Sequence, residues 1–423
     1  MQLFFTRPAA ILLCAALLSI LAARGIVPAM SQIDTDFPNY FTAAKIVADG
    51  GDVDRLYDDS WFQGQMRRYQ IGHTPGGKFT PFPPPTALLL VPLTSLEPLN
   101  ALRVLTAVSV LCLICSTILL AKILAWNRVD SAVFVLLSGY AVLNALRFGQ
   151  PYILASLSCV LGYYALGKGR PLLAGMCFGL FAPIKYFPVV ILIYFVSRKQ
   201  WRVALGGAAM ILAVASVSVG VLGWKIHEDF LSGVFRQHLT GNASVLDPFS
   251  AVYQSFDTLF RRLFVFDAAA NPHPLLPLPG LAGIGASIAK ASIFLAAIAA
   301  IVRLARSGAA SVDAPAIGIL GILTLLLAPA TATYHFVLLW LPVGLLVGYF
   351  LRERVPAYAY FVLGAYALIG FFPYGHAYQF EGRGGLTVLA YPRLFLLLAM
   401  LIACIYYIWH RVDPHGIARA GEE

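Results

Sequence analysis

The sequence predicts an all-α polytopic membrane protein with a bundle of about 12 transmembrane helices and two large extracytoplasmic loops. Of its 423 residues, 59% are hydrophobic and only 12% are charged, whereas soluble domains carry about 25% charged residues. The apolar residues gather in runs near 20 residues long, the length that spans a bilayer as a helix. The basic residues form short clusters between these runs, as residues that set membrane topology do.

The candidate spans are apolar runs bounded by charge, proline or glycine. They are residues 7–29, 83–97, 101–125, 131–146, 150–167, 171–197, 203–223, 281–303, 311–327, 334–350, 355–373 and 387–409. The runs 83–97 and 131–146 are short, which fits tilted, broken or re-entrant segments that line a protein cavity. We expect the first run to be a retained signal-anchor. The competing interpretation is a cleavable signal peptide that ends near Ala22-Ala23.

Basic clusters in the short loops favour cytoplasmic N- and C-termini, with residues 410–423 as a cytoplasmic tail. The long polar segments 30–82 and 224–280 then lie outside, provided that run 83–97 counts as a span. We expect one integral membrane domain over residues 1–423, in the plasma (inner) membrane. Within the first outer loop, apolar residues at helical spacing from Phe37 to Ala48 predict a helix along the membrane interface.

Several function classes lack support in the sequence. The net charge of +10 is scattered rather than gathered in one stripe, so a nucleic-acid partner is not expected. Cys112 and Cys115 form a C-x-x-C pattern inside an apolar run, where buried thiols are expected rather than a metal or redox pair. A P-loop, a dinucleotide fingerprint and zinc-ligand spacing are absent. We expect no cofactor, although a divalent metal is compatible with the sequence.

Asp36 is the candidate catalytic residue. It follows the first span, at the expected outer boundary of water and lipid. A carboxylate at that depth can meet both a lipid-borne and a water-borne substrate, and it can act as general base on a hydroxyl. The alternative is that Asp36 caps a helix whose first turn contains Pro38. Asp34 is a second candidate of the same kind.

Two lysines are candidates for binding an anionic group. Lys78 precedes Phe79-Thr80-Pro81-Phe82 at the end of the first loop, where it either holds phosphate or is solvated. Lys185 lies inside an apolar run between Pro183 and Pro188. An ionisable group there faces a cavity, a partner or a ligand by default, and the alternative is a snorkelling or paired lysine.

His335 and Arg393 fall near the expected outer ends of late spans. An interfacial histidine serves either structure or substrate binding. Arg393, within Tyr391-Pro392-Arg393, either clamps phosphate with two hydrogen bonds or anchors at lipid headgroups. Arg261 and Arg262, in the second outer loop, are weaker candidates of the same kind.

These residues together resemble glycosyltransferase family 87, whose members are polyprenol-phosphate-mannose-dependent α-mannosyltransferase-like enzymes with the GT-C fold. The similar pieces run in order along most of the chain. They are Asp36-Phe37-x-x-Tyr40, Ala43-Ala44, Gly50, Leu56-Tyr57-Asp58, Phe82-Pro83-Pro84, Gly149-Gln150, Lys185-Tyr186-Phe187-Pro188 and Ala328-Pro329 leading to His335. The chain departs from the family pattern at Ala332 and Tyr334, where members often have Trp and His.

The resemblance implies an inverting membrane hexosyltransferase that uses a polyprenyl-phosphate sugar, with mannose or another hexose moved to a hydroxyl of a glycolipid or glycan acceptor. Asp36 takes the place of the family's general base. Tyr40, Lys78, Lys185, His335 and Arg393 are the expected substrate-binding residues. The partners would be the lipid-linked donor, the acceptor and membrane lipids. The alternative function is a transporter or flippase of lipid-linked sugars, although the repeated halves common in transporters are not evident.

Overall fold

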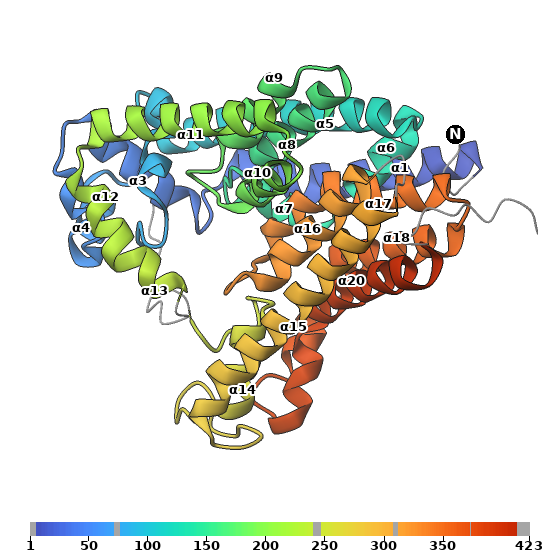
Figure 1. Ribbon diagram of the computed structural model, residues 1–423. Coiled ribbons are helices and arrows are strands. Elements are labelled where there is room, and N and C mark those ends of the chain that lie inside the picture. Colours follow the sequence, from blue (N-terminus) through green and yellow to red (C-terminus); the bar gives the residue numbers. More distant parts are fainter. Residues whose placement is uncertain (1–5, 72–76, 240–246, 308–311, 373, 413–423) are drawn as a thin grey trace, which may run out of the picture. The chain divides into compact units, whose positions relative to one another are not determined.

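The computed structural model describes residues 6–71, 77–239, 247–307, 312–372 and 374–412. Within these residues the regular structure is helical, apart from an isolated β-bridge between Asp267 and Asn271. The prediction of an all-α protein is therefore confirmed. The chain divides into two compact units, Met1–Leu246 and Asp247–Glu423, and each is described by itself (Figure 1). The single membrane domain over residues 1–423 stays a prediction.

The first unit opens with one continuous apolar helix, in which α1 passes through a π-helical turn, Ala22–Ile26, into α2. Its α-helices are α1 Arg7–Leu21, α2 Val27–Ser31, α3 Phe37–Ala48, α4 Asp59–Arg68, α5 Pro98–Leu124, α6 Arg128–Leu136, α7 Tyr140–Arg147, α8 Tyr152–Gly167, α9 Pro171–Leu180, α10 Phe187–Ser197, α11 Trp201–Leu222, α12 Lys225–Asp229 and α13 Arg236–Leu239. Short 3-10 helices at Val53–Arg55, Pro84–Leu88 and Val91–Leu93 and a π-helical segment at Phe230–Phe235 complete it.

The described part of the second unit is built around five long helices, α15, α16, α17, α18 and α20. Its α-helices are α14 Phe256–Phe264, α15 Pro279–Arg306, α16 Asp313–Leu327, α17 Trp340–Arg352, α18 Pro356–Phe371, α19 Tyr374–Tyr378 and α20 Pro392–Arg411, with 3-10 helices at Thr333–Leu339 and Gly384–Ala390. α16 and α17 are buried along most of their lengths, and α15, α18 and α20 pack beside them. The centre of this unit is therefore apolar on nearly every side.

Six helices among the described residues are long and apolar enough to cross a membrane, and a seventh span results if α6 and α7, bent by 73°, count as one. The remaining predicted runs are occupied by apolar helices of 10–17 residues. Long helices such as α11 and α15 expose leucine and isoleucine side chains along much of their surface, which suits contact with lipid. The chain is thus a multi-pass membrane protein. The count of about 12 spans stays a prediction.

Besides run 131–146, which is divided between α6 and α7, two further predicted spans are not continuous α-helices. Residues 83–97 form the 3-10 helices Pro84–Leu88 and Val91–Leu93, because a proline-rich segment lacks the N–H donors that an α-helix needs. The run 171–197 is split into α9 and α10 by a non-helical stretch that contains Pro183. In a bilayer such irregular backbone is tolerated only where protein buries it.

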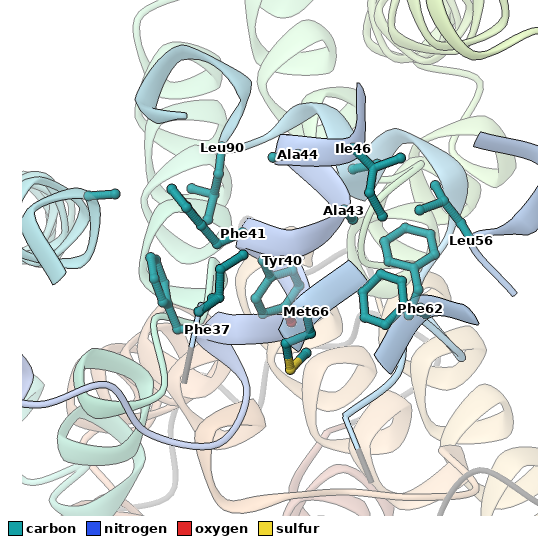
Figure 2. Close-up of a cluster of buried hydrophobic side chains, with 14 of the residues drawn as sticks. Phe37, Tyr40, Phe41, Ala43, Ala44, Ile46, Leu56, Phe62, Met66 and Leu90 are labelled. Atoms are coloured by element: carbon teal, nitrogen blue, oxygen red, sulfur yellow. The ribbon is translucent and has the colours of Figure 1, made fainter. Parts of the chain in front are cut away.

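The position of α3 along the membrane interface stays a prediction. Nine of its residues, from Phe37 to Ile46, are buried, so α3 is enclosed by other parts of the unit. Figure 2 shows Phe37, Tyr40 and Phe41 of α3 among side chains from other elements, with Phe62 and Met66 of α4 close by. The core of this part of the protein therefore forms around α3.

α9 and α11 pack in close backbone contact. A Cβ atom on Gly175 would lie 1.9 Å from the carbonyl oxygen of Val203, and one on Gly206 would lie 2.1 Å from that of Leu172. Glycine is therefore required at both positions. Close approach through small residues is a common way to associate helices in membranes.

We expect Gly175→Val to destabilise the protein by about 1–3 kcal/mol or more, because the added side chain meets backbone that cannot move aside. Thermal unfolding in lipid nanodiscs, followed by intrinsic fluorescence, measures the effect. Gly220→Val is the matched control, because Gly220 lies in α11 of the same helix pair and a Cβ there would have no atom within 4 Å. Equal midpoints for the two variants would contradict the close packing.

Candidate active site

Asp36 and Tyr40 are joined by one buried amide. Gln150 Nε2 donates to Asp36 Oδ2 at 2.6 Å, and Tyr40 Oη donates to Gln150 Oε1 at 2.7 Å. Gln150 is only 1% exposed, whereas Asp36 is half-buried. The side chain of Asp36 makes no capping hydrogen bond to α3, so the capping alternative is not supported. The carboxylate is instead oriented by Gln150.

The backbone at Gly149 allows Gln150 to reach α3. Gly149 has φ of +60°, and a Cβ there would lie 2.8 Å from Phe37 Cδ2. The left-handed conformation and the close approach both require glycine. The turn between α7 and α8 therefore packs closely against the start of α3, and it places the Gln150 amide within hydrogen-bond distance of Asp36 and Tyr40.

Lys185 lies in the break between α9 and α10, beside the same group. Its Nζ is 4.7 Å from the ring centroid of Tyr152, 4.9 Å from that of Phe82 and 5.6 Å from that of Tyr40. It also donates to Tyr40 Oη at 3.3 Å. Three aromatic faces stabilise the ammonium by cation–π attraction. The snorkelling alternative does not fit, because the side chain is held among aromatic rings within the unit.

The phenol of Tyr40 stays protonated over the ordinary pH range. Burial and the neighbouring Asp36 carboxylate raise the pKa of Tyr40 well above its usual value, since both disfavour a phenolate. Tyr40 can therefore act as a donor to Gln150 while it accepts from Lys185. Asp36, Gln150, Tyr40 and Lys185 form one hydrogen-bonded chain, which we call the Asp36 chain.

The other candidates of the first unit are placed differently. Asp34 forms an ion pair with Arg147, with Oδ2 and Nη2 2.8 Å apart, so its carboxylate is already engaged. Lys78 is half-buried, and its backbone N–H donates to Asn39 Oδ1 at 3.0 Å. That bond ties the end of the first loop to α3. Among the side-chain hydrogen bonds and ion pairs of the described residues, none joins the Lys78 ammonium to the Asp36 chain.

His335 and Arg393 belong to the second unit. His335 is half-buried in the 3-10 helix before α17, where its Nδ1 accepts from the N–H of Ala332 at 3.1 Å. Arg393 is 2% exposed, which is inconsistent with an anchor at lipid headgroups. It donates to Thr333 Oγ1 at 2.9 Å and to the carbonyl of Ile369 at 3.2 Å, and its Cζ lies 3.2 Å from the ring centroid of Tyr374.

The family follows from a comparison of sequences. The sequence model of Glycosyltransferase family 87 matches residues 79–329, more than half of the chain. The chain belongs to glycosyltransferase family 87. Comparisons with curated proteins and with solved structures give no significant match.

The family 87 match covers only part of the Asp36 chain. Gln150 and Lys185 of this chain lie within the matched residues, as do the neighbouring rings of Phe82 and Tyr152, whereas Asp36 precedes them. Tyr40, Lys78, His335 and Arg393 also lie outside the match, so their roles rest on the arguments from the residues alone. In the described part of the chain, no group of three or more side chains is arranged to hold a metal ion.

Sequence reasoning missed three contributors to the site. Gln150 was noted only as part of the resemblance, and Arg147 and Tyr152 were not noted at all. The signal for Gln150 was its position after Gly149 between two apolar runs, where a buried amide needs partners. Arg147 could have been recognised as a potential partner for an acidic residue such as Asp34, because an arginine at the end of an apolar helix needs a counter-charge or water.

We expect Arg393→Ala to lower the stability of this family 87 protein by about 3 kcal/mol, because the truncation removes the buried hydrogen bonds of the guanidinium to Thr333 and to the Ile369 carbonyl and leaves a cavity. Thermal unfolding in nanodiscs measures the loss. Arg383→Ala is the control, since Arg383 is exposed and lies shortly before α20. If Arg393→Ala unfolds at the wild-type temperature, the structural role of Arg393 is wrong.

Proposed function

We propose that this family 87 glycosyltransferase moves a hexose, with mannose as the first choice, from a polyprenyl-phosphate donor to a hydroxyl of a glycolipid or glycan acceptor. The reaction takes place at the outer face of the plasma membrane and inverts the anomeric centre. The observation that carries the proposal is the Asp36 chain, which links a carboxylate and an ammonium through one amide and one phenol. Membership of family 87 supports the transferase activity.

The proposed topology has a GT-C-type bundle of about 12 spans with both termini in the cytoplasm. Residues 30–82 and 224–280 are then extracytoplasmic, in accord with the basic clusters of the short loops. Asp36, at the start of α3, directly follows the first long apolar helix, Arg7–Ser31. This position suits a base that serves a donor whose lipid tail stays in the bilayer.

Asp36 is the proposed general base. Its carboxylate takes the proton of the acceptor hydroxyl while that oxygen attacks the anomeric carbon of the donor. The bond between the anomeric carbon and the phosphate oxygen breaks, and the polyprenyl phosphate leaves with the electron pair from the opposite face. Phosphate needs no strong protonation to leave, so a second carboxylic acid, as in glycosidases, is not required.

Lys185 is the proposed partner of the departing phosphate. An ammonium in partly buried surroundings stabilises developing negative charge much more strongly than it would in water. The Tyr40 hydroxyl accepts from Lys185 and donates to Gln150. These two bonds position the ammonium relative to α3. Lys78, His335 and Arg393 remain proposed substrate-binding residues of secondary rank.

We expect Asp36→Asn to lower sugar transfer by about 10²–10⁴-fold, because the amide cannot accept the hydroxyl proton. The assay uses polyprenyl-phosphate mannose and related lipid-linked hexoses with purified protein in nanodiscs. Asp59→Asn removes an exposed carboxylate at the start of α4 and serves as the control. Unimpaired transfer by Asp36→Asn would contradict the assignment of Asp36 as the base.

The flippase alternative is tested separately in sealed vesicles. It holds if the wild-type protein moves lipid-linked sugar across the vesicle membrane and transfers none of it to an acceptor.

We expect Lys185→Met to lower kcat/KM for the lipid-linked donor by about tenfold to a hundredfold, since a hydrogen bond to a charged group is lost. Initial rates over a range of donor concentrations measure the effect. Lys168→Met, at the exposed end of α8, controls for the loss of one positive charge. A wild-type kcat/KM for Lys185→Met would contradict the phosphate role.

A further inference from the structure

A small cavity lies at the end of α3 opposite to Asp36. It has a volume of about 160 Å³ and is lined by Asp49, Asp52, Trp61, Gln65, Arg68 and Tyr69. Sites for drug-sized ligands have volumes of roughly 300–1,000 Å³, so this cavity suits a much smaller group. Its walls combine two aromatic side chains with carboxylate, amide and guanidinium groups.

The cavity lies between one face of α4 and the turn that follows α3. On α4, Trp61, Gln65 and Arg68 are spaced four and three residues apart, which places them on one face of the helix. Asp58 caps α4 by accepting from the N–H of Trp61 at 3.0 Å. On the other side, α3 ends at Ala48, and Asp49 and Asp52 follow in the turn around Gly50, which has φ of +66°.

The aromatic walls are held in place. Arg55 Cζ lies 5.2 Å from the centre of the Trp61 ring. Trp61 and Tyr69 both pack against the buried cluster around α3. Burial and the nearby Asp49 carboxylate raise the pKa of Tyr69, so its phenol remains a neutral donor and acceptor. Preformed aromatic surfaces lose little conformational entropy when a ligand binds.

The chemistry of the walls selects the class of ligand. The lining holds two carboxylates and one guanidinium, and Lys45 Nζ pairs with Asp49 Oδ1 at 3.1 Å. The charges around the cavity are therefore nearly balanced, which favours a neutral ligand. In the described residues no group of side chains suits a metal ion. Carboxylate and amide oxygens accept hydrogen bonds, while Gln65, Arg68 and Tyr69 donate them. A pyranose ring presents hydroxyls that do both, and its apolar face packs on aromatic rings.

We propose that this cavity is a subsite for one neutral pyranose unit of the acceptor glycan. The assignment to the acceptor rests on the proposed function. From Asp36 to Asp49 the chain advances 13 residues, or about 20 Å along a helix, so the bound unit is not the one that carries the reacting hydroxyl. The cavity would hold a more distant sugar of the same acceptor and thereby select acceptors of sufficient length.

The test measures sugar binding independently of transfer. Full-length protein in lipid nanodiscs is mixed with the methyl pyranosides of mannose, glucose and galactose, and saturation-transfer-difference NMR reports contact. Nanodiscs are needed because glycoside detergents would compete for the cavity. We expect at least one pyranoside to bind wild type and Asp36→Asn equally, and Trp61→Ala to bind it about tenfold more weakly.

Two further variants make the result specific. Gln65→Leu removes hydrogen bonds from the cavity wall without touching the aromatic packing, and we expect it to weaken binding as Trp61→Ala does. Trp201→Ala, which removes an exposed tryptophan of α11, should bind as wild type does. The proposal is overturned if no pyranoside contacts the wild-type protein, or if both cavity variants bind like wild type. Binding retained in Asp36→Asn supports the subsite whether or not Asp36 proves to be the base.

The acceptor assignment has its own readout. With a long glycan acceptor, we expect Trp61→Ala to raise the acceptor KM while kcat changes little, because the distant subsite contributes binding rather than chemistry. With an acceptor that carries a single sugar, the acceptor KM of Trp61→Ala should equal that of the wild-type protein. Equal KM changes for both acceptors would refute a distant acceptor subsite.

Discussion

The buried amide of Gln150 is the interaction on which the candidate site depends. A carboxylate beside apolar helices is costly unless hydrogen bonds satisfy it. Gln150 supplies one donor to Asp36 and one acceptor to Tyr40, and it is almost fully buried while doing so. Each of its two bonds fixes a different residue of α3. The orientation of Asp36 is therefore set by the turn between α7 and α8 rather than by the loop that precedes α3.

The positions of the charged candidates follow from the same rule. Within the first unit Asp34 is neutralised by Arg147, and Lys185 is surrounded by aromatic rings and held by Tyr40. Asp34 pairs with Arg147, which is not part of the Asp36 chain, whereas Asp36 accepts from Gln150 within it. Of two carboxylates two residues apart, Asp36 is thus the one linked by hydrogen bonds to Tyr40 and Lys185. This difference, rather than depth in the membrane, favours Asp36 over Asp34.

Composition and the spacing of apolar runs predicted the helical membrane class and the places of most helices, because burial in lipid imposes long apolar segments. The family resemblance was confirmed by the match over residues 79–329. What the pattern could not give is where a run breaks. Hydropathy does not distinguish one helix over 171–197 from the two short helices α9 and α10. It also gave no sign that α3 would be enclosed by protein, since enclosure depends on contacts far away in sequence.

These breaks explain why the site forms where it does. Three non-helical stretches of the first unit meet at the first turn of α3: Phe82 reaches Tyr40 from one, Gln150 from the second and Lys185 from the third. Irregular backbone within a membrane protein must be covered by protein, and α3 provides that cover. Of the three side chains, Lys185 comes from a break inside a predicted span, whereas Phe82 and Gln150 come from segments between helices. The loss of continuous helix at residues 181–186 is therefore what brings the Lys185 ammonium to Tyr40.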